Sequence, residues 1–136
     1  MKVLLDTNVL IAALISRGVC SDLLEHCFLH HTIVTSHPLL EELRDQLINK
    51  FKYGTQEADE AVSLLQSQMS LVPAPLLQQP VCRDPDDDVV LATAIEAIAD
   101  CIITGDKDLL ILQKYQNVVI VRPSDFADFE AKGRGP

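Results

Sequence analysis

Acidic side chains recur at the ends of short apolar segments of this sequence, where carboxylates from distant positions could meet. Asp6 directly follows the apolar run 3–5, and Asp106 and Asp108 follow the apolar run 101–104. Carboxylates in one crevice raise each other's pKa, so such a cluster becomes favourable only around a hard divalent cation. Mg²⁺ and Mn²⁺ take oxygen ligands and activate water for the hydrolysis of phosphate esters. The acidic residues therefore predict a divalent-cation site.

Two further acidic regions join this pattern. Glu41 and Glu42 lie in the helix predicted after the β-branched run 32–35, and Asp88 opens an apolar helix. The apolar stripe of the first helix leaves both glutamates about 130° from its centre, so periodicity does not choose between them. Asp6 is the clearest functional residue, because a charge between a buried strand and an apolar helix is hard to explain as solvated surface.

The acidic turn before Asp88 has a purely structural explanation as well. Asp84, Asp86 and Asp87 are expected to be turn and first-turn residues, since carboxylates at a helix start interact favourably with the helix dipole. The extra carboxylates also mean that the functional position could fall on Asp84 or Asp87 instead of Asp88.

The elements that must position these residues alternate between short apolar strands and helices. Strands are expected at 3–5, 32–35, 70–72, 101–104 and 118–121, and helices at 8–16, 20–30, 36–50, 54–65, 89–99, 109–112 and 124–131. This alternation predicts an α/β fold, a three-layer α/β/α sandwich with a central, mainly parallel sheet. In such sheets the ligand crevice lies outside the carboxyl ends of the strands, where the acidic residues fall.

Length and composition fit one domain. The chain has 136 residues, of which 48% are apolar, and we expect a domain at 1–131 with a flexible tail at 132–136. An apolar run follows Lys2, but the polar residues within it and the lack of a cleavage site argue against a signal peptide. We expect no membrane segment.

The four cysteines indicate a reducing compartment, and hence a cytoplasmic protein. They have no C-x₂-C spacing, and two of them lie among apolar residues, where a free thiol behaves as a small hydrophobe. The alternative is a zinc site, whose spacing would match no known pattern. Its ligands would be Cys20, His26, Cys27 and His30.

Four segments, in order, resemble the motifs of the PIN-domain ribonucleases. They are 4–10 (LLDTNVL), 35–43 (TS, then EL), 88–94 (DVVLATA) and 103–109 (ITGDKDL). Each motif alone is a weak signal, but four motifs in the family's order are a strong one, and together they cover nearly the whole chain. The subgroup that the chain resembles most is the small bacterial, VapC-like PIN proteins, the toxin components of toxin–antitoxin pairs.

The resemblance assigns roles by position and selects Glu42 over Glu41. The implied catalytic and metal-binding residues are Asp6, Glu42, Asp88 and Asp106, helped by Asn8, Ser36, Thr104 and Asp108. It implies Mg²⁺ or Mn²⁺ as cofactor, RNA as substrate and cleavage that leaves a 5′-phosphate. It also implies a cognate antitoxin protein and a homodimer or higher homo-oligomer.

The total net charge of the chain disfavours RNA binding, but the charge outside the acidic cluster does not. The formal charge is −9, whereas affinity for phosphates comes mostly from Lys and Arg. Setting aside the five acids of the implied site leaves 11 basic and 15 acidic residues. Without the three carboxylates of the acidic turn, the rest of the chain is nearly balanced. RNA binding is therefore expected to be weak and dependent on metal.

Two alternatives remain open. The first is a non-catalytic PIN-like scaffold that binds metal or nucleic acid without turnover. The second is a phospho-acceptor receiver domain, which would need an acidic pair after the first strand, whereas Thr7 and Asn8 follow Asp6 here. Turnover of RNA would exclude the first, and the absence of labelling by acetyl phosphate would exclude the second.

Overall fold

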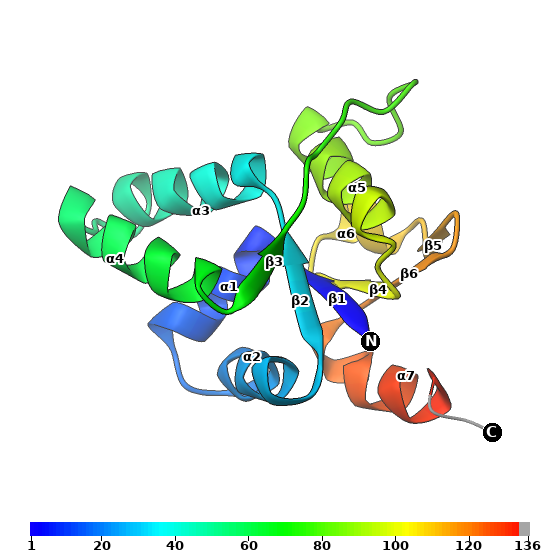
Figure 1. Cartoon of the computed structure of the whole chain (residues 1–136), viewed down its shortest axis with the longest axis horizontal. Helices are drawn as coiled ribbons and strands as arrows, with labels where there is room; N and C mark the ends of the chain where they lie inside the picture. The colour runs from blue at the N-terminus through cyan, green and yellow to red at the C-terminus, as the bar shows by residue number, and fades with distance from the viewer. Residues whose placement is uncertain (134–136) are drawn as a thin grey trace.

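A computed structural model describes residues 1–133, which form a six-stranded sheet with helices on both faces (Figure 1). The elements are β1 (Lys2–Leu5), α1 (Thr7–Ile15), α2 (Val19–His30), β2 (Thr32–Thr35), α3 (His37–Asn49), α4 (Thr55–Gln66), β3 (Met69–Leu71), α5 (Pro85–Ala97), β4 (Cys101–Ile103), α6 (Lys107–Leu110), β5 (Lys114–Tyr115), β6 (Val118–Val121), η1 (Pro123–Asp125) and α7 (Phe126–Gly133). The strand order is β3-β2-β1-β4-β6-β5. Among these six strands of the described residues, only the β5–β6 pair is antiparallel. The predicted α/β/α sandwich with a mainly parallel sheet is confirmed.

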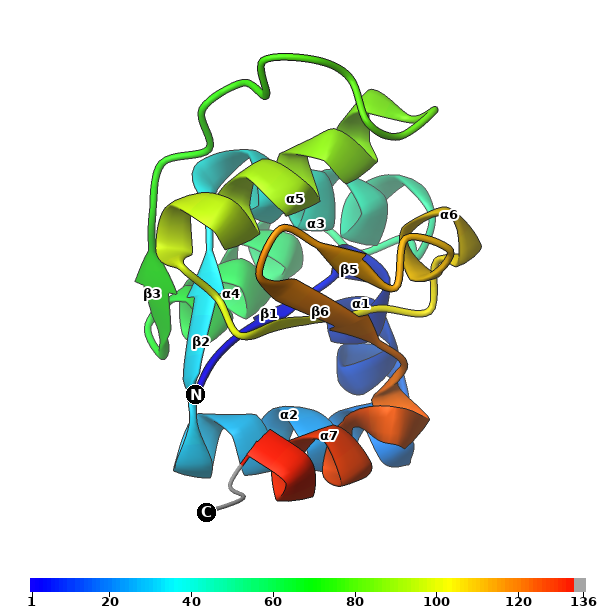
Figure 2. The ribbon, with the colours of Figure 1, turned by 90° about the vertical axis from the view of Figure 1, so that its right-hand side faces the viewer.

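The central strands are buried on both faces, which explains their continuous apolar sequences. Val3 and Leu5 of β1 point into a core shared with α1, α2, α3 and α4, while Leu4 points to the opposite core, under α5 and α6. Ile33 and Val34 of β2 divide in the same way. Figure 2 shows the layers, with α5 on one face of the sheet and α2 and α7 side by side on the other.

The start of α5 differs from the prediction in a way that matters for the site. The helix begins at Pro85, four residues before the predicted 89. Pro85 occupies the first turn, where its missing N–H costs nothing, and the Asp84 carboxylate caps the helix by accepting from the Asp86 N–H at 2.9 Å. The acidic residues thus lie inside the first turn and not before it.

Other boundaries hold within about two residues of the prediction, but the two-residue strand β5 was not predicted. The closing helix is split into η1 and α7, and α7 continues to Gly133. Two residues of the predicted flexible tail therefore belong to a helix, while 134–136 lie outside the described residues.

Within residues 1–133, no single helix is long and apolar enough to cross a membrane. The helices α1 and α2 meet the length and composition criteria only together, as a pair bent by 108°.

Candidate metal centre

The carboxyl ends of β1 and β4 bring Asp6 and Thr104 together. The two strands are parallel neighbours with Leu5 opposite Ile103, so the residues that follow also face each other. The Thr104 hydroxyl donates to Oδ2 of Asp6 at 2.8 Å, and the Thr7 N–H donates to Oδ1 at 2.8 Å. Asp6 is buried and both of its oxygens are held in place. The strand order turns between β1 and β4, which is where α/β sheets place their ligands.

Thr104 also positions Asp106. Its hydroxyl oxygen accepts the Asp106 N–H at 3.0 Å, and Asp106 in turn caps α6 by accepting the Asp108 N–H at 2.8 Å. One buried hydroxyl therefore connects two of the predicted carboxylates. Asp108 lies beside them and accepts two hydrogen bonds from Nη2 of Arg83, at 2.8 and 3.1 Å.

Glu42 reaches the same place from α3, whereas Glu41 does not. Oε1 of Glu42 accepts a hydrogen bond from Gln46 at 3.0 Å, and its Oε2 lies 3.4 Å from the Thr7 hydroxyl. Glu41 is exposed and is absent from the lining of the cavity that contains Asp6. Of the two glutamates that periodicity does not distinguish, the structure therefore places Glu42 in the lining of the cavity.

Asp88 is the predicted residue that the structure does not bring to this site. Its carboxylate accepts the backbone N–H groups of Val81 and Cys82, the latter at 2.8 Å, so it fastens the preceding loop to α5. Asp87 is the buried carboxylate that faces Asp106. The reason is the earlier helix start, because adjacent residues of an α-helix point about 100° apart.

Of the predicted supporting residues Asn8 and Ser36, one lies at the cavity and the other does not. Asn8 lines the cavity. Ser36 is fully buried, and its hydroxyl lies 2.8 Å from that of Thr93, which donates its own proton to the Val89 carbonyl oxygen. The proton between the two hydroxyls therefore belongs to Ser36. Ser36 connects the end of β2 to α5, and the described contacts of its side chain include no carboxylate.

These side chains enclose a polar cavity of about 260 Å³. It is lined by Asp6, Asn8, Glu42, Gln46, Lys50, Asp84, Asp86, Asp87, Val90 and Asp106. Burial raises the pKa of Asp6, opposed by its hydrogen bonds from Thr104 and Thr7. Burial and the charges of Asp86 and Asp6 raise the pKa of Glu42. Burial, the charge of Asp106 and a hydrogen bond with it raise the pKa of Asp87 to about 7. A bound cation would lower all three pKa values.

The donor set fits a hard divalent cation. Asp87, Asp106 and Asp108 each offer an oxygen, and these three atoms lie within 4.8 Å of one another. Asp6 and Glu42 add carboxylates to the same cavity, and its lining includes no imidazole or thiol. All-oxygen sites of this kind favour Mg²⁺ or Mn²⁺.

Several lining residues were not assigned a role from the sequence, in which Asp87 was only an alternative to Asp88. Asp87 could have been found from the Asp-Pro pair, since proline in a first helical turn fixes where the helix starts. Val90 and Leu91, three and four residues after Asp87, are fully buried, which puts Asp87 on the inner face. Gln46 lies one turn after Glu42 on α3, and Lys50, two turns after Glu42, directly follows the last residue of α3. No sequence signal separated them from ordinary surface residues.

The four residues weighed for a zinc site do not come together. Among the described residues, Cys20, His26, Cys27 and His30 form no group of potential ligands, and all four cysteines of the chain are free. His26 instead meets His31 and Glu130.

Comparison with known families decides the identity of the chain. Residues 2–108 match the model of the PIN domain, a span that contains all the carboxylates of the cavity. The chain belongs to the PIN domain family. PIN domains are generally nucleases that use divalent metals, and the cluster of carboxylates agrees with that chemistry.

One relative of this PIN domain and one solved structure extend the comparison. The uncharacterized protein MJ1680 of Methanocaldococcus jannaschii is 34% identical over 118 residues, which cover 83% of this chain and 76% of that protein. VapBC2 of Rickettsia felis, solved bound to a DNA fragment from its promoter, includes a chain with a TM-score of 0.66. At 16% identity the match covers 90% of this PIN domain and 98% of that chain, and it shows a shared fold.

Proposed function

We propose that this PIN domain is a metal-dependent endoribonuclease. The observation that carries the proposal is the convergence of Asp6, Glu42, Asp87 and Asp106 on one cavity at the carboxyl ends of parallel strands. Mg²⁺ or Mn²⁺ bound there supplies an activated water and neutralises charge on the phosphate oxygens. The proposal takes Asp87 in place of Asp88 as the acidic residue from α5.

Other residues of the protein orient the carboxylates and are suited to contact the substrate. Thr104 and the Thr7 N–H hold both oxygens of Asp6, so this carboxylate needs no reorganisation to bind a cation. Gln46 orients Glu42 from the same helix. Lys50 is the basic residue of the cavity lining and is suited to contact a backbone phosphate.

A cleavage assay tests the proposal. Single-stranded RNA is incubated with the protein and Mg²⁺ or Mn²⁺, and the products are resolved by length. We expect cleavage that EDTA stops and that Asp6→Asn reduces more than ~100-fold, because removing even an outer partner of a ligand costs about 10–100-fold. Asp22→Asn is the matched control, since Asp22 is exposed on α2, away from the cavity. Unchanged cleavage by Asp6→Asn, or metal binding without turnover on any RNA, contradicts the proposal.

We further propose that the protein is the toxin of a cytoplasmic toxin–antitoxin pair and that it self-associates. The shared fold with VapBC2 supports the pairing, and the free cysteines agree with a reducing compartment. Ile15 and Leu64, both about half exposed or more, offer apolar surface for self-association. Expression in bacterial cells is expected to arrest growth for the wild type and not for Asp6→Asn. Equal growth of both strains contradicts the toxin role.

A further inference from the structure

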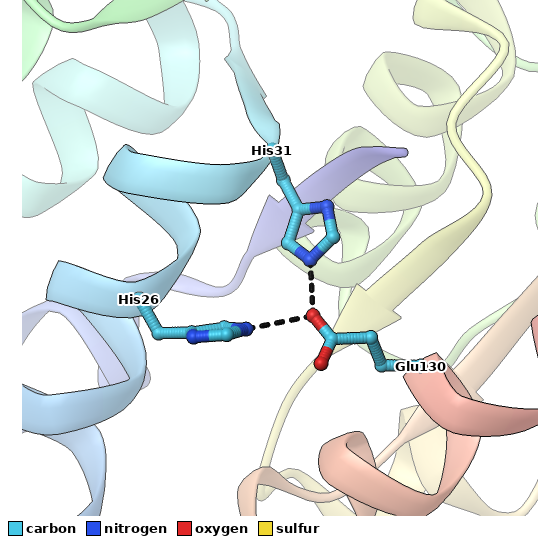
Figure 3. Close-up of side chains that lie close together, drawn as sticks. All are labelled: His26, His31 and Glu130. Atoms are coloured by element: carbon cyan, nitrogen blue, oxygen red, sulfur yellow. Dashed lines mark hydrogen bonds and ion pairs between the residues drawn. The ribbon is translucent and has the colours of Figure 1, made fainter. Parts of the chain in front are cut away.

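A second group of potential metal ligands lies at the other end of the sheet. Nε2 of His26 lies 2.7 Å from Oε2 of Glu130, and Nε2 of His31 contacts the same oxygen (Figure 3). One ligand atom from each of the three residues lies within 4.8 Å of the other two. His31 directly precedes β2, so this group sits at the amino ends of the parallel strands, opposite the carboxylate cavity. The two groups share no residue.

The three side chains come from two helices that the fold holds against each other. His26 belongs to α2, His31 follows its last residue, and Glu130 belongs to α7, which lies beside α2 (Figure 2). The buried ring of Phe126 stands edge-on to both histidines, with ring centroids 5.7 Å from His31 and 6.5 Å from His26. Its side chain helps to fix the orientation of both imidazoles.

Burial makes this group more than a chance meeting of surface residues. The side chain of His31 is 3% exposed and that of Glu130 is 14% exposed, whereas His26 is 40% exposed. The first two ligands are thus preorganised in a partly dry site, and His26 leaves a path to solvent. A cation entering there would meet two nitrogen donors and one carboxylate oxygen.

We propose that His26, His31 and Glu130 bind a first-row divalent transition-metal ion, with Zn²⁺ as the representative, which ties α7 to α2. Two imidazoles and a carboxylate are a common ligand set for Zn²⁺ and suit Mg²⁺ poorly. The all-oxygen cavity instead favours hard cations such as Mg²⁺. The protein therefore holds two cation sites that differ in chemistry as well as in position.

Zinc affinity tests the proposal. Competition with a chromogenic chelator, in excess Mg²⁺ to fill the carboxylate cavity, is measured for the wild type and His26→Gln. We expect one tight Zn²⁺ per chain and a loss of at least ~10-fold in affinity for the variant, since even outer partners of a ligand cost that much. His37→Gln is the matched control, because His37 is exposed at the start of α3. The half-exposed position of His26 makes the variant compatible with folding, which circular dichroism checks.

A second measurement on the unmodified protein keeps the test independent of any variant. Imidazole NMR signals of His26 and His31 should shift on addition of Zn²⁺, while that of His37 stays in place. Equal Zn²⁺ affinity in wild type and His26→Gln overturns the proposal, as does zinc binding that moves no histidine signal. A loss of zinc caused by Asp6→Asn and not by His26→Gln would place the ion in the carboxylate cavity and also overturn it.

Discussion

The hydroxyl of Thr104 donates a 2.8 Å hydrogen bond to the carboxylate of Asp6, across 98 residues of sequence. The same hydroxyl oxygen accepts the backbone N–H of Asp106. Thr104 is fully buried, so neither bond competes with bulk water. Parallel pairing of β1 with β4 brings the two residues together, because each directly follows the last residue of its strand. The sheet therefore positions both side chains at the site.

Thr104→Val should weaken metal binding while keeping the fold. The substitution preserves shape but removes the partner of one Asp6 oxygen and leaves the Asp106 N–H unsatisfied, at a cost of about 1–3 kcal/mol in the free energy of unfolding. We expect affinity for Mn²⁺ to fall about 10–100-fold, as for other outer partners of metal ligands. Calorimetric titration measures it, and Thr104→Ser, which keeps the hydroxyl, should restore most of the affinity. Equal affinity in all three proteins would show that the hydroxyl is structural only.

Asp87 and Asp88 should behave oppositely when replaced. Asp87→Asn is expected to lose RNA cleavage, because Asp87 faces Asp106 in the cavity. Asp88→Ala is expected to cut RNA normally but to unfold more easily by about 1 kcal/mol, since two backbone N–H groups lose their acceptor. Cleavage rates and urea unfolding midpoints of the two variants show which of the two residues is catalytic and which is structural. The reverse pattern would return the catalytic role to Asp88.

This one-residue difference shows where sequence reasoning reached its limit. The alternation of apolar runs and helices was enough to predict the three layers and to place the acidic residues near the carboxyl ends of the strands. Family resemblance was enough to select Glu42, which the structure brings to the cavity. The direction of each carboxylate in the run from Asp84 to Asp88 depends on where the helix starts, and one residue changes the direction by about 100°.

Ser36 illustrates a second limit. A serine before a helix suggests a cap or a polar neighbour of the metal site, but its side chain caps no backbone group of α3 and meets Thr93 instead. That partner is 57 residues away, on a helix that packs against β2. Local sequence contains no signal for such a contact, because tertiary packing alone determines it. The same holds for Glu130, whose histidine partners lie about 100 residues earlier.

Ser36→Ala should therefore affect stability and not metal binding. The Thr93 hydroxyl oxygen loses its donor in a fully buried place, which costs about 1 kcal/mol in the free energy of unfolding. Urea unfolding measures this loss, and Mn²⁺ affinity is expected to match that of the wild type. Ser67→Ala is a useful control, because the Ser67 hydroxyl donates to the nearby Leu64 carbonyl oxygen at an exposed helix end. A drop in Mn²⁺ affinity for Ser36→Ala would show that this serine supports the metal ligands after all.

The metal-free protein should become less stable as pH rises from about 4 to about 7. An unfolded aspartate titrates near 4, whereas burial and the charge of Asp106 raise the pKa of Asp87 to about 7 in the folded protein. The folded state therefore binds more protons than the unfolded state in this window, so the free energy of unfolding falls with rising pH. The contribution of Asp87 is fully present below about 4 and is lost as pH rises through about 7.

Urea unfolding in EDTA at several pH values measures this slope. Excess Mg²⁺ should reduce it, because a bound cation keeps the carboxylates ionised in the folded state. Asp87→Asn should reduce it without any cation, since the group that takes up the proton is gone, and Asp22→Asn should leave it unchanged. Stability that rises with pH across this window in EDTA would contradict a raised pKa of Asp87 in the folded protein. A falling slope that survives Asp87→Asn would assign the proton to Asp6 or Glu42, whose pKa values are raised by burial as well.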